Sequence, residues 1–137
     1  MHVILVAPHF PANQRRFAQA LKHAGARVTG VGEASWDQLD GELRSWLDGW
    51  EQVSNVCDAG ALEGAVRRIQ ARGPWVHRLE ATVEAHMLAA AQVRERTGIP
   101  GLSSLSVLRC RDKFEMKRFL MAHGIPCAAQ GAVDTGK

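Results

Sequence analysis

Short apolar runs alternate with helical segments along most of the sequence, and this alternation constrains the fold more than any other feature. Residues 3–6 (VILV) form a continuous apolar run, which is typical of a strand buried on both faces. The helical segment that follows has a predicted inner face of Phe17, Ala20, Leu21 and Ala24. A second apolar run spans residues 28–31. A strand, a helix and a second strand in this order predict a right-handed crossover within a parallel sheet.

The same alternation continues downstream. In chain order, the further predicted elements are a helix over residues 41–48, a strand over 53–57, a helix from Asp58 to Gly73, a strand over 75–79 and an alanine-rich helix over 82–96. Four β–α units in series predict an α/β fold with a doubly wound, Rossmann-like parallel sheet of about four to five strands. We expect the strand order 3-2-1-4, with helices on both faces of the sheet.

Length, composition and cysteine usage exclude several classes. A chain of 137 residues has room for one domain, or for one domain with an appendage, and it contains no apolar run long enough to cross a membrane. The opening MHVILVAP lacks the basic leader of a secretory signal. Cys57, Cys110 and Cys127 are odd in number and form no C-x-x-C pair, which favours a reducing cytoplasm over disulfides or a metal site. The charge of +3 is spread along the chain, so neither a nucleic-acid nor a membrane partner is indicated.

The most strongly marked helix begins after Asp112. Asp112 is a favoured N-cap residue, and Glu115 three positions later fits a capping box. Gly124 and Pro126 end the helix. Its predicted apolar face consists of Met116, Phe119, Leu120 and His123. Lys113 therefore lies on the first turn, where the positive end of the helix dipole and free backbone N–H groups favour an anion.

This stretch resembles the segment that opens the nucleotide-binding domain of ATP-grasp enzymes, among them biotin carboxylase. The resemblance rests on R-D-K at residues 111–113, a helix carrying F-x-M-K-x-x-L, and G-I-P-x-A at residues 124–128. In the family the lysine of the D-K pair contacts ATP phosphates, which implies that role for Lys113. A Rossmann-like pre-ATP-grasp domain directly precedes R-D-K in these enzymes. The resemblance therefore implies a pre-ATP-grasp domain over residues 1–108 and the start of the ATP-grasp domain over 109–137.

The resemblance also implies a reaction. ATP-grasp ligases join a carboxylate to an amine or related nucleophile through an acyl phosphate, with ATP and Mg²⁺ as cofactors and small molecules as substrates. The Mg²⁺ ligands, a second lysine and a glycine-rich lid lie further downstream in the family. We therefore expect that this chain is an N-terminal piece of such an enzyme, with no catalytic residue of its own. By itself it should be inactive and bind ATP weakly or not at all.

Candidate substrate contacts follow from the predicted sheet. Ligands of open parallel sheets bind beyond the carboxyl ends of the strands, near the switch in strand order, which selects residues 7–13 (APHFPAN) and 79–82 (LEAT). Glu80 suits an amine or a sugar hydroxyl, and LEAT resembles a stretch of formate-dependent glycinamide ribonucleotide transformylase whose glutamate contacts substrate. The alternative is that Glu80 belongs to the first turn of the next helix, where acids are favoured. His9 and Asn13 are further candidates, although loop histidines are commonly structural.

Two other patterns allow different functions. Trp36, Trp46 and Trp50 recur at a helical period and could mark an exposed homodimer surface or simply pack against the sheet. A stand-alone doubly wound module that binds a small molecule or dimerises is the alternative function. Residues 131–137 (GAVDTGK) match the spacing of a phosphate-binding P-loop, but no Ser or Thr follows the lysine and no buried strand precedes the motif. We therefore expect strand and turn there, with residues 127–133 entering the first strand of a new unit.

Overall fold

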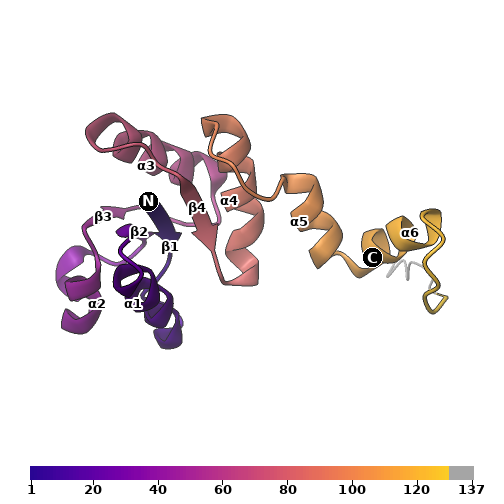
Figure 1. Ribbon diagram of the computed structural model, residues 1–137, viewed down its shortest axis with the longest axis horizontal. Coiled ribbons are helices and arrows are strands. Elements are labelled where there is room, and N and C mark those ends of the chain that lie inside the picture. The colour runs from indigo at the N-terminus through magenta and orange to yellow at the C-terminus, as the bar shows by residue number, and fades with distance from the viewer. Residues whose placement is uncertain (130–137) are drawn as a thin grey trace.

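The computed structural model describes residues 1–129 and shows a four-stranded parallel sheet (Figure 1). The strands are β1 (His2–Val6), β2 (Arg27–Gly32), β3 (Gly49–Gln52) and β4 (Arg78–Ala81). Their order across the sheet is β3-β2-β1-β4, and every neighbouring pair is parallel. The predicted doubly wound α/β fold and its strand order 3-2-1-4 are therefore confirmed.

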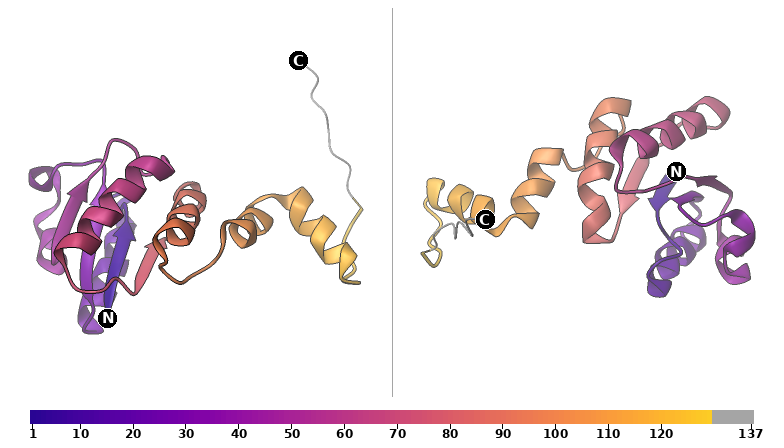
Figure 2. Two further views of the ribbon diagram at one scale, coloured as in Figure 1. Left: turned by 90° about the horizontal axis from the view of Figure 1, so that it is seen from above. Right: turned by 180° about the vertical axis from the view of Figure 1, so that it is seen from behind.

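The helices of residues 1–129 divide into four that cover the sheet and two that leave it. They are α1 (Arg15–His23), α2 (Gly41–Trp46), α3 (Ala59–Arg72), α4 (Glu84–Thr97), α5 (Ser104–Arg111) and α6 (Lys113–Ala122), with short 3-10 turns η1 (Ala12–Gln14) and η2 (Trp36–Gln38). Helices α5 and α6 follow α4 and project away from the sheet (Figures 1 and 2). We call residues 1–103 the sheet domain and residues 104–129 the extension. Among residues 1–129, no helix is both long and apolar enough to cross a membrane.

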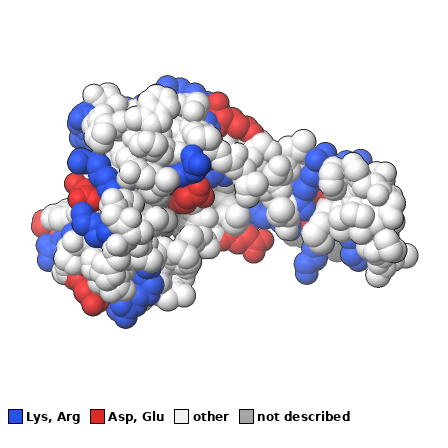
Figure 3. All heavy atoms as spheres, viewed as in Figure 1, with Lys and Arg blue, Asp and Glu red and all other residues white. Residues whose placement is uncertain are grey.

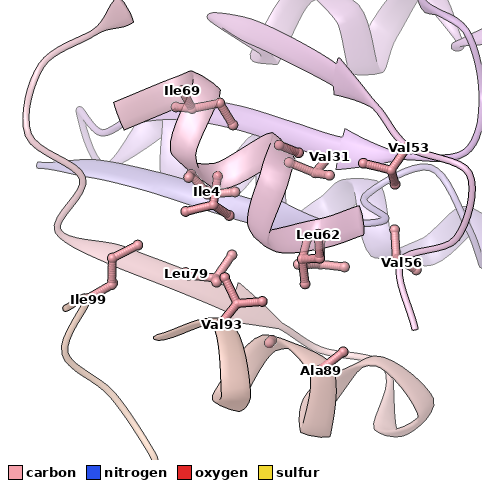
Figure 4. Packing of buried hydrophobic residues seen from close by; sticks show 14 of the residues in the cluster. Ile4, Val31, Val53, Val56, Leu62, Ile69, Leu79, Ala89, Val93 and Ile99 are labelled. Carbon is pink, nitrogen blue, oxygen red and sulfur yellow. The ribbon is translucent and has the colours of Figure 1, made fainter. Parts of the chain in front are cut away.

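Two buried clusters hold the sheet domain together, one on each face. The larger lies beneath α3 and α4, where Leu62 and Val93 meet Ile4 of β1 (Figure 4). The smaller lies beneath α1 and α2, and consists of Leu5, Ala18, Val28, Leu39, Leu43 and Leu47. Because successive side chains of a strand point to opposite faces, the apolar run of β1 supplies both clusters. This is the reason that the run is continuous rather than alternating.

The third strand lies earlier than the sequence pattern predicts. Residues 53–57 were expected to form it, but β3 is Gly49–Gln52, and Trp50 belongs to this strand rather than to a helical stripe. Val53 and Val56 are buried all the same, because the loop after β3 packs them into the larger cluster. As an edge strand, β3 is only partly covered, so it needs no apolar run.

The fourth strand, in contrast, lies later than predicted. Residues 75–79 were expected, whereas β4 spans Arg78–Ala81. Trp75 is 68% exposed and stands outside the strand, and Val76 is buried just before it. The backbone N–H of His77 donates to His2 O at 2.9 Å, which aligns the approach to the strand with the start of β1. The shift places Glu80 inside β4.

Helix capping was predicted more accurately than helix faces. The Asp58 side chain accepts hydrogen bonds from the first turn of α3, and Gly98 ends α4 in the left-handed conformation. The predicted inner face of α1 is wrong in phase: Ala18 is fully buried, while Phe17 is 47% exposed. A small residue such as Ala18 lets the helix approach the sheet closely. A pattern that looks only for large apolar side chains does not predict this. Residues 127–129 form no strand, and residues 130–133 and the lysine-ended motif at 131–137 lie outside the described range.

Candidate functional site

The loops that follow β1 and β4 lie next to each other at the carboxyl edge of the sheet. Strands β1 and β4 pair in parallel, so both chains leave the sheet on the same side. The Thr82 hydroxyl donates a hydrogen bond to the side-chain oxygen of Gln14, which joins the two exits directly. The predicted stretches 7–13 and 79–82 are thus brought together, as the strand order requires.

The exit from β1 is a sharp, strained turn. Ala7 has a φ of 48°, the left-handed region that side chains other than glycine seldom adopt. Its N–H donates to Val31 O at 2.7 Å, and its carbonyl accepts from Phe10 N at 3.3 Å. Strain of this kind is concentrated at binding sites, where surrounding structure holds it in place. The turn supports the choice of this edge as the candidate site.

Glu80 presents an accessible carboxylate at this edge. It lies one residue before the end of β4, and its side chain is 48% exposed. Helix α4 begins at Glu84, so the alternative that Glu80 belongs to the first turn of that helix is excluded. The nearest cation that forms an ion pair with it among the described residues is Arg94, whose Nη1 lies 4.0 Å from Glu80 Oε2. Such a carboxylate can accept hydrogen bonds from an amine or a hydroxyl.

His9 turns toward the other side of the sheet. Its ring lies directly over Gly32 at the end of β2, and it meets Trp50 edge-on with the ring centroids 5.6 Å apart. In the described part of the chain, His9 Nδ1 is buried and has no hydrogen-bond partner. Burial lowers the pKa of His9, so the neutral imidazole is favoured. Since β1 separates β2 from β4, the structure does not join His9 and Glu80 in one cluster.

Two neighbours of His9, His86 and Glu33, were not predicted as site residues from the sequence. His86, in the first turn of α4, also has a buried Nδ1 without a partner among residues 1–129. Burial lowers the pKa of both histidines, and the nearby Glu33 carboxylate opposes that effect in each. Glu33 follows β2 directly and accepts a hydrogen bond from Val56 N at 2.9 Å. The rule that ligands gather beyond strand ends would have selected Glu33, whereas nothing in the spacing of His86 pointed to it.

These groups do not form a metal site. Among residues 1–129, no group of three His, Cys, Asp or Glu side chains is arranged to hold a metal ion. Asn13 lies on η1, exposed to solvent. The edge therefore offers the imidazoles of His9 and His86 and the carboxylate of Glu80, a surface suited to a polar small molecule.

Lys113 lies apart from these residues. It is the first residue of α6, at the outer part of the extension, so the structure does not place it beside Glu80, His9 or Asn13 (Figure 1). On the face shown in Figure 3, basic side chains lie over the extension as well as over the sheet domain. The extension thus carries cations of its own, at a distance from the sheet edge.

The start of α6 is capped, which limits what it can offer to an anion. Asp112 Oδ1 accepts hydrogen bonds from Phe114 N at 2.9 Å and Glu115 N at 3.0 Å. The capping box is half formed, because the Glu115 carboxylate accepts from Arg118 instead. The expectation of free N–H groups is therefore wrong for these two, and the Asp112 carboxylate adds a negative charge nearby. A phosphate contact fits the Lys113 ammonium but not an open backbone cradle.

Comparisons with solved structures identify the fold. No protein-family model and no curated protein sequence matches the chain. Phosphoribosylglycinamide synthetase from Anaerococcus prevotii matches over 90% of this chain with a TM-score of 0.70 and 12% identity. L-amino acid ligase from Bacillus licheniformis matches over 91% with a TM-score of 0.70 and 16% identity. Glycinamide-RNase-transformylase T from Mycobacterium tuberculosis matches over 97% with a TM-score of 0.69 and 22% identity.

The shared part is a fraction of each of those proteins. This chain covers 29%, 30% and 36% of the three, so it spans about a third of their length. At these identities the similarity establishes the fold and does not establish a substrate or a reaction. The chain has the fold of the N-terminal, pre-ATP-grasp region of these ATP-grasp enzymes, as the resemblance in sequence predicted.

Proposed function

We propose that this chain is the N-terminal part of an ATP-dependent ligase that joins a carboxylate to an amine, or to a related nucleophile, through an acyl phosphate. One observation carries the proposal: the fold of nearly the whole chain, extension included, matches about a third of enzymes whose names include a synthetase and a ligase. The R-D-K segment, which runs from the end of α5 to the start of α6, supports the proposal independently of the fold, because the sequence resemblance rests on these residues.

In this proposal the two regions have separate tasks. Residues 1–108 form a pre-ATP-grasp domain in which Glu80, with His9 and Asn13, contacts substrate at the sheet edge. Residues 109–137 begin the nucleotide-binding domain, where the Lys113 ammonium contacts ATP phosphates. Bound ATP would supply the phosphoryl group that activates the carboxylate, with Mg²⁺ and cationic side chains stabilising the transferred charge. The separation of Lys113 from Glu80 supports the view that the chain alone is inactive.

Isothermal titration of the 137-residue chain with MgATP tests the nucleotide part of the proposal. Lys113 alone contributes one charge and no backbone cradle, so binding should be weaker than micromolar or undetectable. Micromolar affinity would contradict the division of tasks. A reading frame that continues past residue 137, with a further lysine and late acidic residues, is what the ligase proposal requires.

Steady-state kinetics of the protein encoded by that longer frame test the two site assignments separately. Release of ADP would be measured with a panel of amines and carboxylates. Glu80→Gln should raise KM for the amine or hydroxyl substrate by more than it raises KM for ATP, whereas Lys113→Ala should do the reverse. Glu63→Gln, on α3, and Lys117→Ala, four residues after Lys113, serve as controls. If Glu80→Gln behaves like Glu63→Gln, Glu80 does not contact substrate.

A stand-alone module that dimerises is the second candidate, and a specific feature favours it. Trp36 is 41% exposed and lines a groove of about 400 Å³ with Trp50, beside the edge strand β3. Trp46 and Trp50, however, are partly buried against the smaller core, and Trp50 Nε1 donates to Ala34 O at 3.0 Å. Sedimentation velocity should show a dimer that Trp36→Ala weakens if the module dimerises there. A monomer in both cases would exclude this candidate.

A further inference from the structure

A buried arginine joins the candidate substrate edge to the segment that leads into the extension. Arg94, on α4, is 6% exposed. Its Nη1 donates to Leu79 O at 2.6 Å. Its Nε and Nη2 both donate to Leu102 O, at 3.2 and 2.9 Å. One guanidinium therefore ties strand β4 to residues 99–103, which connect α4 to α5.

The connecting segment is built around this side chain. Gly101 has a φ of +156°, and a Cβ added there would lie 2.6 Å from Arg94 Cδ. Ile99 anchors the same segment in the larger core. The Leu79 carbonyl belongs to β4, an edge strand of the four-stranded sheet, so Arg94 also satisfies an acceptor that no neighbouring strand reaches. The arginine is thus a hydrogen-bond partner that β4 and the connecting segment share.

The charge of Arg94 is compensated by Glu80 at the substrate edge and by the neighbouring Glu95. A guanidinium this deeply buried is costly unless acceptors and an anion surround it. The two carbonyls supply acceptors, and the carboxylate in ion-pair distance among residues 1–129 is Glu80, at 4.0 Å. Removing the Glu80 charge would make the buried position of Arg94 less favourable. States in which Arg94 releases Leu102 O would then be more populated.

We propose that Arg94 is a positioning residue that couples the Glu80 carboxylate to residues 99–103, and through them to the helices that carry Lys113. The proposal rests on the function proposed above, in which Glu80 contacts substrate and Lys113 contacts ATP, so that the coupling links the two sites. A cationic group that binds Glu80 competes with Arg94 for the same carboxylate and loosens the extension. A neutral donor, such as a hydroxyl, leaves the ion pair in place.

Hydrogen exchange of the 137-residue chain tests the coupling without any ligand. Glu80→Gln should raise the exchange of amides in α5 by about twofold to threefold, the range expected for a partly exposed ion pair. Arg94→Lys keeps the charge but cannot reach both carbonyls, so it should raise α5 exchange by itself. In the Arg94→Lys background, Glu80→Gln should add nothing further. The matched control is Glu63→Gln. It removes the carboxylate that lies 3.4 Å from Arg96, which is on α4 like Arg94, and it should leave the amide exchange of α5 unchanged.

Two results would overturn the proposal. The first is unchanged amide exchange of α5 in the Glu80→Gln variant. This variant should fold even if Arg94 variants do not, because the Glu80 side chain is half exposed. The second is a Glu80→Gln effect of equal size with and without Arg94, which would show that the coupling bypasses the arginine. Neither result depends on substrate binding, so failure of the coupling and failure of the ligase assignment are distinguishable.

Discussion

The sheet domain and the extension are built from similar sequence patterns, but they are stabilised differently. Each helix that covers the sheet buries at least one residue in a cluster on that face. In the extension, α5 buries Val107 and α6 buries nothing among the described residues. Large apolar side chains remain exposed along the extension, namely Leu102 at its junction with the sheet domain, then Leu105, Leu108, Phe114, Met121 and Ile125. An amphipathic pattern thus predicts a helix without predicting what covers its apolar face.

The difference teaches that capping and packing are separate sources of order. Helix α6 is held locally, by the Asp112 cap and by Arg109, whose guanidinium lies 4.1 Å over the Phe119 ring. Helix α3 has an equivalent cap at Asp58 and also contributes Leu62 to the larger core. Because isolated short helices are marginal in water, we expect the extension to open more readily than the sheet domain. The predictions below test that contrast.

The largest effect should come from truncating one leucine in each region. Leu62→Ala removes a fully buried side chain and should lower the free energy of unfolding by about 3 kcal/mol, since the cavity cannot collapse. Leu120→Ala, at a half-buried position of α6, should cost less than about 1 kcal/mol. Urea unfolding followed by circular dichroism measures both. Equal losses would show that the extension belongs to the same cooperative core.

The next largest effect should be a loss of stability in mild acid that is confined to the sheet domain. Burial lowers the pKa of His2, His9 and His86 below 6.5. As the pH falls, these imidazoles bind protons near their ordinary pKa in the unfolded chain. In the folded domain the same imidazoles bind protons only at lower pH, so the unfolded state takes up protons first. The free energy of unfolding should therefore fall as the pH drops from about 7.5 to 5.5.

His86→Gln is the variant that isolates one of these groups. It removes a titrating ring whose Nδ1 has no partner in the described structure, so stability near neutral pH should change little. The slope of stability against pH should become shallower. Urea titrations at several pH values give that slope directly. A slope identical to that of the unmodified chain would mean that His86 does not contribute to the acid sensitivity.

The sequence predicted the sheet better than the site, for physical reasons that particular residues make clear. The runs at β1 and β2 are buried on both faces, so their composition reveals them. Strand β3 is a partly covered edge, and its position depends on pairing with β2, which no local pattern records. Glu80 was selected as a candidate because strand order alone brings it to the carboxyl edge of the sheet. Arg94 was not, because its partners Leu79 and Leu102 lie on separate segments and are backbone atoms.

A smaller effect should come from removing the two equivalent helix caps. Asp58→Ala should lower the free energy of unfolding of the sheet domain by about 1 kcal/mol, the usual cost of losing an N-cap. Asp112→Ala removes a cap of the same geometry from α6. It should reduce helical signal and protection in α6 and leave the main unfolding transition unchanged. A shift of that transition by both variants would remove the distinction between the regions.

The smallest effect concerns the contacts that position α6. An exposed cation–π contact contributes about 0.5–1 kcal/mol, so Arg109→Ala should raise amide exchange in α6 roughly twofold to fivefold. Arg111→Ala is the matched control, since Arg111 Nε faces Glu84 Oε1 of α4 at 3.6 Å rather than α6. It should loosen the attachment of α5 to the sheet domain and leave the Arg109–Phe119 contact in place. If Arg109→Ala instead lowered the stability of the sheet domain, the local contacts of α6 would be linked to the core, and the contrast between the regions would fail.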